Sequence, residues 1–288
     1  MKVPVYRSVP DPWRGWIGLR RGRRWLQALV LARSHNRAVP DGAPTINFYP
    51  MRPGPNATIA TVLARLPARI GHSRSGGALR FAWDTGTTSP SSSLQNLAAD
   101  AINRRCLDIS KGHVDRTWAQ VAGYSISVDP LTTHGPIVEK PEQNGRHAGR
   151  VVEGPLTRRA PGMVYQRLVE SLTEDGRIVQ LRVVVIGSQI VFVYGKWRPY
   201  GHWFKGTDLT LPQPTEEMLS ADEQSLVLRF SSAMGIEYGE LDALRDRDGR
   251  LYVVDANRTP VLPKGLPREA ADEAFGLQAE ALRRLIES

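Results

Sequence analysis

Cysteine and long hydrophobic runs are almost missing from this sequence, and each absence excludes a class of protein. The 288 residues include one cysteine, Cys106, so no disulfide can form within the chain and no zinc site can be built from several cysteines. So little cysteine is typical of a reducing compartment, and we expect a cytoplasmic location. No apolar run approaches the roughly 20 residues of a membrane span, and residues 1–16 lack the apolar core of a signal peptide. We therefore expect no membrane partner.

Acidic side chains are outnumbered by basic ones. The chain has 29 Asp and Glu against 38 Lys and Arg, which gives a formal net charge of +9 and a pI of about 10.0. This excess favours anionic partners such as nucleotide phosphates, acidic substrates or nucleic acid. Compositional bias on a solvated surface explains it equally well. The apolar content of 41% is ordinary for one or two globular domains, and the sequence leaves open whether the protein is a homo-oligomer.

The first 105 residues have an irregular pattern. Five arginines and three tryptophans are interleaved between residues 13 and 25. Such a stretch, Arg14 to Trp25, could bind single-stranded nucleic acid by stacking, but we favour a strand over 24–32 with its flanking arginines in water. Further along we expect a helix over 57–66, a buried strand over 79–83, a loop over 84–93 that contacts substrate, and a short helix over 94–103.

From residue 106 on, the elements are easier to assign. Gly187-Ser188 is a tight turn that joins two strands, and Ser220 with Glu223 forms a capping box that opens a helix ended by Gly235. The other expected elements are a helix over 113–121, strands over 137–140, 163–169, 177–186 and 189–194, a proline-bearing loop over 209–215, and a last helix over 269–286.

An acidic hairpin is expected near the C-terminus. Two strand-like segments flank the turn Asp246–Gly249, and side chains two apart on a strand share a face. With a four-residue loop, Asp242 lies opposite Val253 and Glu240 lies opposite Asp255, and Asn257 joins the same face. Facing carboxylates are destabilising unless a positive charge compensates them. Oxygen-only ligands indicate Mg²⁺ or Mn²⁺ rather than zinc.

The order of several motifs resembles the ATP-grasp superfamily. The branch it resembles most is that of the ribosomal-protein glutamate ligases (RimK-like), over residues 106 to 264. The motifs are Lys111, Lys140, the glycine loop 143–149, Tyr165-Gln166-Arg167-Leu168, Arg182, Lys196, Arg198, Asp242 and Asp255-Ala256-Asn257. The resemblance implies an α+β/α/β protein with the ATP-grasp fold, in which two α+β subdomains grip ATP behind a small α/β pre-ATP-grasp domain. It implies an N-terminal substrate domain at 1–105 and an ATP-grasp domain at 106–288, divided into a lid-like part at 106–165 and a metal-binding part at 166–288.

The resemblance also implies roles for individual residues. ATP would be bound by lysines, by glycines of the mobile loop, and by a hinge that holds adenine and ribose, namely Lys111, Lys140, Gly145, Gly149, Gln166, Leu168 and Glu170. Arg167 stands where the family often has an acidic residue. A solvated lysine and an ordinary surface loop are the alternative interpretations of the lysines and of 143–149.

The metal ligands and catalytic cations follow from the same resemblance. Asp242, Asp255 and Asn257 match the magnesium ligands, although the family usually has glutamate at the position of Asp255. Arg182, Lys196 and Arg198 match the catalytic cations. A salt bridge to Glu240 is the structural alternative for Arg182, and an exposed basic strand end is the alternative for the other two.

These assignments imply an ATP-dependent ligase that activates a carboxylate as an acyl-phosphate for attack by an amine. Its partners would be ATP, Mg²⁺ (or Mn²⁺), a small-molecule or peptide carboxylate and an amine. Two alternatives stay open: a kinase of the same fold that phosphorylates a hydroxyl, and a basic nucleic-acid-binding module that uses the Arg/Trp-rich stretch. Nucleic acid is not the expected partner of the ligase.

Overall fold

The computed structural model describes residues 21–94, 96–146, 148–204 and 206–288, without the side chains of 21–26, 91 and 93. Most of the Arg/Trp-rich stretch, with its expected nucleic-acid contacts, therefore lies outside the described residues, as does His147 of the glycine loop. No helix in the described ranges is long and apolar enough to cross a membrane.

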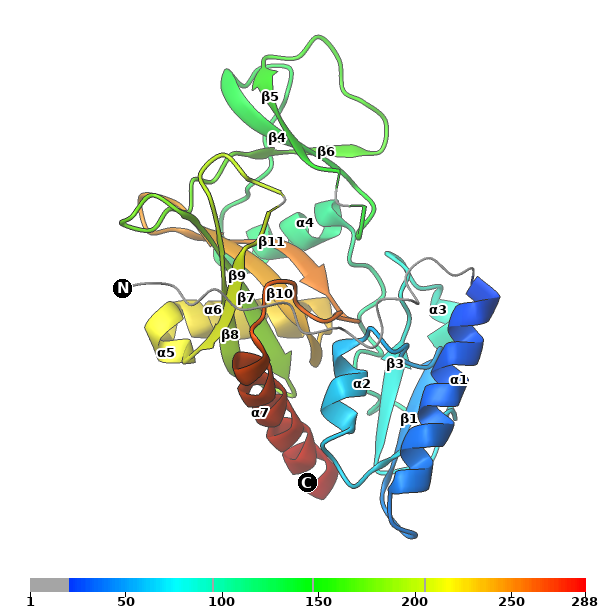
Figure 1. Ribbon diagram of the computed structural model, residues 1–288. Coiled ribbons are helices and arrows are strands. Elements are labelled where there is room, and N and C mark those ends of the chain that lie inside the picture. The colour runs from blue at the N-terminus through cyan, green and yellow to red at the C-terminus, as the bar shows by residue number, and fades with distance from the viewer. Residues whose placement is uncertain (1–20, 95, 147, 205) are drawn as a thin grey trace.

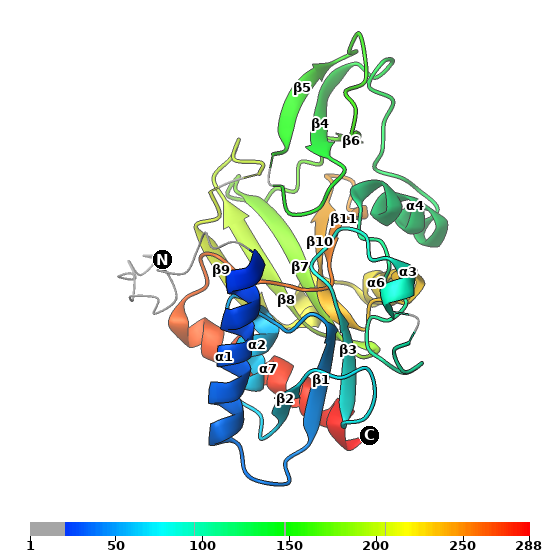
Figure 2. The ribbon, with the colours of Figure 1, turned by 90° about the vertical axis from the view of Figure 1, so that its right-hand side faces the viewer.

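Three β-sheets organise the chain, and Figures 1 and 2 show them stacked from the N-terminal unit to a projecting small sheet. The first sheet has the order β2-β1-β3, with strands β1 (Thr45–Pro50), β2 (Arg69–Gly71) and β3 (Leu79–Trp83), all parallel. The small sheet has the order β5-β4-β6, with β4 (Gly135–Pro141), β5 (Arg150–Gly154) and β6 (Met163–Arg167). The third has the order β11-β10-β7-β8-β9, with β7 (Ile178–Ile186), β8 (Gln189–Arg198), β9 (Leu209–Gln213), β10 (Tyr238–Arg245) and β11 (Leu251–Asn257).

Two predictions for the N-terminal unit are wrong. The segment expected to be a strand over 24–32 belongs to helix α1 (Arg21–Ala38). Its Leu, Gln, Ala and Arg residues are strong helix formers, and Ala28 and Ala32 are buried four residues apart on one face. The helix expected over 94–103 is replaced by α3 (Ser91–Leu94) and turns. Asn103 adopts a left-handed φ of 62°, which a helix interior does not permit.

The remaining helices agree with the sequence patterns, except the four-residue helix α5, which was not predicted. Ser220 and Glu223 form both bonds of the predicted capping box, and Gly235 ends that helix in the left-handed conformation. Gly123 ends the helix over Lys111–Ala122 in the same way. The helices are α2 (Thr58–Leu63), α4 (Lys111–Ala122), α5 (Thr215–Met218), α6 (Ala221–Met234) and α7 (Arg268–Glu287).

The edge of the large sheet differs from the prediction. The loop expected over 209–215 contains strand β9, which pairs with β8. Pro212 obscured this strand in the sequence, but on an edge strand the missing proline N–H need not break a ladder bond. Strand β5 had no counterpart among the predicted elements, since its exposed pattern gives no alternation signal.

The acidic hairpin forms with a different register. Arg245 pairs with Leu251 across a five-residue connection, and a bulge follows Asp242. The prediction that Glu240 faces Asp255 is therefore wrong: Asp242 faces Asp255, and Glu240 faces Asn257. A bulge adds one residue to one strand and so shifts the pairing beyond it.

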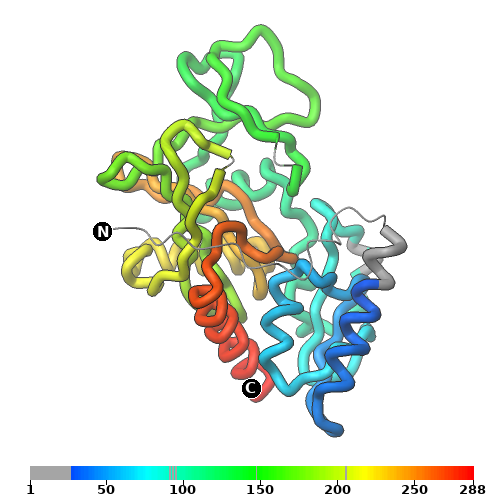
Figure 3. Tube along the Cα trace, viewed as in Figure 1, coloured from blue at the N-terminus to red at the C-terminus, as the bar shows by residue number. Residues whose placement is uncertain are grey.

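Two hydrophobic cores lie on opposite faces of the large sheet. Val184 and Ile186 of β7 face the N-terminal unit and α7, while Val183 and Val185 face α4 and α6. Figure 3 shows that α7, near the C-terminus, lies beside α2 of the N-terminal unit. The N-terminal unit therefore shares its core with the large sheet, and the small sheet projects away from both.

Candidate nucleotide and metal site

A buried ion-pair cluster lies at the centre of the large sheet. Arg182 on β7 donates from Nε and Nη2 to both carboxylate oxygens of Asp242 on β10, at 2.6 and 2.9 Å. Its Nη1 donates to Glu240 Oε2 at 3.2 Å. Burial opposes ionisation of Asp242, but the Arg182 and Lys196 charges hold the pKa of that carboxyl well below its usual range. Burial outweighs Arg182 at Glu240 and raises its pKa to about 7. The salt bridge weighed for Arg182 in the sequence is thus present.

The next strand adds the other predicted metal ligands. Asp255 lies directly opposite Asp242, and Asn257 lies two residues further on. Burial raises the pKa of Asp255, Lys111 and Lys140 act to lower it, and Asp242 acts to raise it. In the described part of the chain, no cation forms an ion pair with Asp255. Asp255 is therefore the carboxylate of the cluster that only more distant cations compensate.

The ligand set suits a hard divalent cation. Carboxylate and carboxamide oxygens are what Mg²⁺ and Mn²⁺ take, and the charge of Asp255 invites one. Asp242 is different, because both of its oxygens accept from Arg182. Among the described residues, no group of three or more His, Cys, Asp or Glu side chains is arranged so that it could hold a metal ion. The fit therefore depends on Asp255 and on the amide oxygen of Asn257, with Asp242 as the third predicted ligand.

Three lysines approach the cluster. Lys140 near the end of β4 is attracted by Asp255, and burial lowers its pKa to about 8. Lys196 on β8 lies 4.0 Å from Asp242, and burial lowers its pKa to about 8 as well. Lys111 opens α4, and its Nζ donates to the Gln143 carbonyl at 3.3 Å. Positive side chains from the small sheet, α4 and the large sheet therefore converge on the carboxylates.

The glycine loop is folded onto the end of the hairpin. Asn144 Nδ2 donates to the Ala256 carbonyl at 3.1 Å and to Asn257 Oδ1 at 3.4 Å, and the Asn144 amide donates to Thr87 Oγ1 at 3.0 Å. Gly145 has a φ of 74°, a left-handed conformation that favours glycine. The loop thus bridges the candidate metal ligand Asn257 and the predicted substrate loop.

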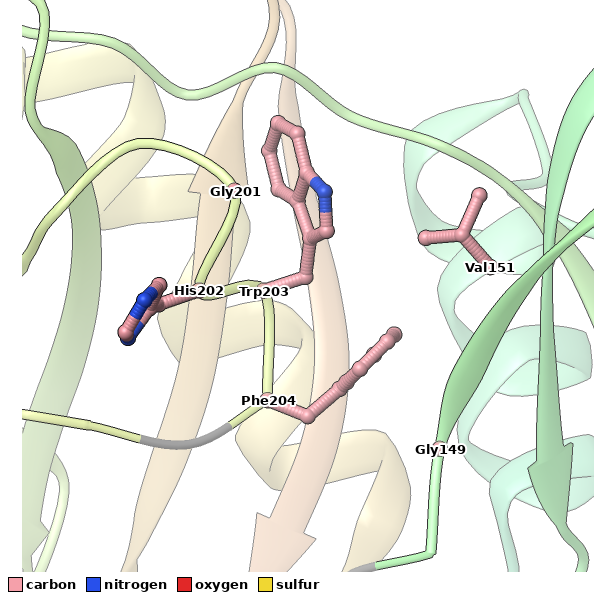
Figure 4. Close-up of a pocket in the computed structure, with 6 residues that line it drawn as sticks. All are labelled: Gly149, Val151, Gly201, His202, Trp203 and Phe204. Carbon is pink, nitrogen blue, oxygen red and sulfur yellow. The ribbon is translucent and has the colours of Figure 1, made fainter.

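An aromatic cavity of about 370 Å³ adjoins the end of this loop. Figure 4 shows the Phe204 ring directed toward the segment that carries Gly149 and Val151, the Trp203 ring above it, and His202 turned away. A Cβ added at Gly149 would lie 2.9 Å from the Phe204 ring, so the strand after the glycine loop and the segment after β8 are in close contact. The cavity is bounded on one side by the small sheet and on the other by the large one.

The predicted hinge residues differ in burial and in their hydrogen-bond partners. Gln166 is buried, and its Oε1 has no hydrogen-bond partner within the described residues, while Leu168 is half-buried. Glu170 pairs with Arg247 at 2.5 Å and accepts from the Tyr200 hydroxyl at 3.3 Å. Gln166 and Leu168 lie where β6 leaves the small sheet for the large one. Glu170 has partners of its own that a ribose would have to replace.

Arg198 forms hydrogen bonds to the segment that follows its own strand, β8. It donates to the Trp203 carbonyl at 2.6 Å, to Thr207 Oγ1 at 3.2 Å and to Gln180. Burial lowers its pKa, and Asp242 acts to raise it, so it belongs to the same electrostatic field. Its hydrogen bonds fix the segment that carries the aromatic cavity.

Sequence reasoning missed two residues that build this site. Arg258 is fully buried and donates to the carbonyls of Asp84 at 3.1 Å and Gly86 at 2.8 Å, as well as to Cys106. Glu142 accepts from the Gly112 amide at 3.1 Å at the start of α4. Their adjacency to Asn257 and to the glycine loop was the available signal.

Comparisons with known proteins give the fold. A scan against models of protein families gives no match. The ATP-grasp ligase PsnB, solved with a minimal precursor, superposes with a TM-score of 0.51 at 19% identity, over 68% of this chain and 68% of that chain. Biotin carboxylase from Campylobacter jejuni gives a TM-score of 0.48 at 14% identity, over 90% and 68% of the two chains. L-amino acid ligase from Bacillus licheniformis gives 0.46 at 16%, over 66% and 50%. The superposition with PsnB, together with the sheets described above, shows that this chain has the ATP-grasp fold, as the order of its motifs predicted.

Proposed function

We propose that the protein is an ATP-dependent carboxylate–amine ligase. The observation that carries the proposal is the convergence of Lys140, Lys111 and Lys196 on a carboxylate pair, Asp242 and Asp255, within an ATP-grasp fold. Phosphoryl transfer needs positioning and charge neutralisation more than covalent chemistry from the protein. Cations on one side and carboxylates that can hold a metal on the other supply both requirements.

The domain division follows the sheets. We assign residues 1–105 to substrate binding, 106–165 to a lid that covers the phosphates, and 166–288 to the metal-binding part. The lid boundary falls inside β6, next to Gln166. A hinge at this point lets the small sheet, which projects from the rest of the molecule in Figure 1, move as one piece.

ATP lies between the small and large sheets in this proposal. Lys111 and Lys140 bind phosphate oxygens, and backbone amides of the loop with Gly145 and Gly149 complete the cradle. The orphaned Oε1 of Gln166 and the half-buried Leu168 border the adenine. Glu170 reaches the ribose hydroxyls once it exchanges its bond with Tyr200.

Mg²⁺, or Mn²⁺, would be held by Asp255 and Asn257 with Asp242. When bound, such a cation neutralises negative charge on the phosphate oxygens. Arg182 is fixed by two carboxylates, so its guanidinium enters the reaction already oriented. Lys196 faces the same point, and Arg198 keeps the adjoining aromatic segment in place.

The proposed reaction has two steps. An oxygen of the substrate carboxylate attacks the γ-phosphorus, the bond to ADP breaks, and an acyl-phosphate forms. The nitrogen of an amine then attacks the acyl carbon, inorganic phosphate leaves, and the amine proton passes to solvent or base. The substrate is a small-molecule or peptide carboxylate, and the order of motifs supports a RimK-like ligase.

A phosphate-release screen of candidate acids against candidate amines, with ATP and Mg²⁺, tests the proposal. A ligase releases ADP and free phosphate only when acid and amine are both present. A kinase of the same fold would instead retain the phosphoryl group on its product, and that result would overturn the ligase assignment.

A matched pair of variants connects the activity to the site. Asp255→Ala removes a carboxylate of the cluster, whereas Asp248→Ala removes an exposed aspartate from the turn of the same hairpin. Loss of turnover in the first variant alone supports the site. Equal turnover in both would contradict it.

A further inference from the structure

The N-terminal sheet presents an edge of parallel strands that the proposed chemistry does not use. β1 lies between β2 and β3, and all three strands run in the same direction. The chain leaves β1 toward β2 and then passes to β3 on the other side, so two connections diverge beside β1. Ligands of open α/β sheets bind at the carboxyl ends of the strands at such a point.

Cations gather at the carboxyl ends of β1 and β2. Arg52 follows β1, His72 and Arg74 follow β2, and Arg33 on α1 lies close enough to repel Arg52. Within the described residues, none of these four forms an ion pair. The Nε of Arg52 is buried and has no hydrogen-bond partner in that same part of the chain.

The electrostatics of the cluster are unfavourable to its positive charges, as far as the described residues go. Burial lowers the pKa of Arg52, and Arg33 lowers it further. Burial also lowers the pKa of His72, Arg52 acts in the same direction, and a bond to the Phe48 carbonyl opposes them. Neighbouring cations that repel one another are unfavourable unless an anion compensates them.

Part of the cluster is already oriented. Arg74 Nη2 donates to the Tyr49 hydroxyl at 2.6 Å, and its guanidinium carbon lies 4.7 Å from the centroid of the Tyr49 ring. The same ring lies 5.6 Å from that of His72. A guanidinium held over an aromatic ring keeps donors of its planar fork for a carboxylate or phosphate.

This edge adjoins the glycine loop. The Met51 amide, next to Arg52, donates to the Trp83 carbonyl at 3.2 Å, so the residues after β1 lie against the end of β3. The loop that follows β3 includes Thr87, which accepts from the Asn144 amide at 3.0 Å. A substrate held at the cluster would therefore lie on the side of the N-terminal unit that meets the candidate ATP site.

We propose that Arg52, His72 and Arg74 form an oxyanion subsite that binds a carboxylate or phosphate group of the substrate, separate from the carboxylate that is activated. The interpretation of this site as a substrate subsite rests on the proposed ligase function. It narrows the substrate class to acids that carry a second anionic group.

Titration of the full chain with small probes tests the subsite directly. The probes are glutarate for a carboxylate, methyl phosphate for a phosphate, and glutaramide as the uncharged control, and binding is followed by ¹H–¹⁵N NMR of arginine and histidine side chains. We expect one of the two anions to shift the signals of Arg52, His72 and Arg74, and glutaramide to leave them unchanged. The anion that binds more tightly identifies the chemical source.

Matched variants separate a built site from general charge attraction. Arg52→Gln and Arg74→Gln should each weaken anion binding at least about tenfold, the size of one charge-assisted hydrogen bond. Arg69→Gln, at the opposite end of β2 and beside Asp41, should change it less than about twofold. Arg52→Lys keeps the charge but removes the planar fork of donors, and anion binding is measured in this variant if Arg52→Gln does not fold.

The same samples separate failure of this inference from failure of the proposed function. Mg²⁺–ADP affinity, measured by calorimetry, should be unchanged in the Arg52 and Arg74 variants. Wild-type protein that binds Mg²⁺–ADP but neither anion would overturn the subsite alone, as would equal weakening by Arg69→Gln. Protein that binds the anion at these residues but no Mg²⁺–ADP would keep the subsite and overturn the ligase proposal.

Discussion

Removing Arg182 should destabilise the fold strongly, because two buried carboxylates would lose their counter-charge together. The Glu240 side chain is 1% exposed and that of Asp242 is 8% exposed, and both accept from Arg182. Breaking a buried pair by removing one partner costs about 3–5 kcal/mol. Arg182→Gln should therefore lower the free energy of unfolding at pH 7 by about 3–5 kcal/mol.

The pH dependence of this loss is a second, independent signature. In the wild-type protein the pKa of Asp242 is depressed, so Asp242 stabilises the fold at neutral pH and loses that contribution as the pH falls toward its folded pKa. The pKa of Glu240 is raised to about 7, so its ionisation already opposes folding above the unfolded value. Without Arg182 both carboxyls prefer to be protonated. The loss of stability should therefore be smaller at pH 5 than at pH 7.

Urea unfolding followed by tryptophan fluorescence at both pH values measures the effect. Arg177→Gln is the matched control, since Arg177 directly precedes β7 and its Nη2 donates to both carboxylate oxygens of Asp208 near the surface. Exposed pairs contribute about 1 kcal/mol or less. A loss below about 1 kcal/mol for Arg182→Gln, similar to that of the control, or a loss that does not depend on pH, would refute the reasoning.

Three further predictions concern the nucleotide site. Asp255→Ala should lower turnover by ~10²–10³ while circular dichroism stays unchanged; full activity in a folded variant would contradict its role. Gly149→Ala should weaken nucleotide binding measured by calorimetry, because the added Cβ would lie 2.9 Å from Phe204. Gly54→Ala is the control and should leave binding unchanged, because its Cβ would meet nothing within 4 Å. Equal effects of the two variants would count against a close-fitting lid. Nucleotide affinity should fall as the pH rises above about 8, where Lys140 and Lys196 lose their protons, by up to about tenfold per pH unit for each lysine that binds phosphate. Lys140→Arg should make this fall less steep, and an identical profile in the variant would exclude Lys140 as a group responsible.

The order of motifs sufficed to predict the fold, and local chemistry sufficed for several elements. Gly187-Ser188 joins β7 and β8 as expected, and the Ser220 capping box opens α6. In these places the local preference and the tertiary environment agree. The prediction of a strand over 24–32 was wrong, although the Leu, Gln, Ala and Arg residues of this segment are strong helix formers.

The geometry of the candidate site was less accessible from sequence. The register of the hairpin depends on a bulge after Asp242, which no residue of the turn announces. The five-residue connection and that bulge together decide that Asp242 rather than Glu240 faces Asp255, and Glu240 is buried beside Arg182. The contact between Asn144 and Thr87 joins segments far apart in the chain, and no local pattern encodes it.

The most direct test of the account follows an oxygen atom. An acid substrate from the screen is prepared with ¹⁸O in its carboxylate and turned over with ATP, Mg²⁺ and amine, and the released phosphate is analysed by mass spectrometry. Activation through an acyl-phosphate transfers one carboxylate oxygen, so the phosphate should carry a single ¹⁸O. Unlabelled phosphate, or a phosphorylated product with no phosphate released, would contradict the account.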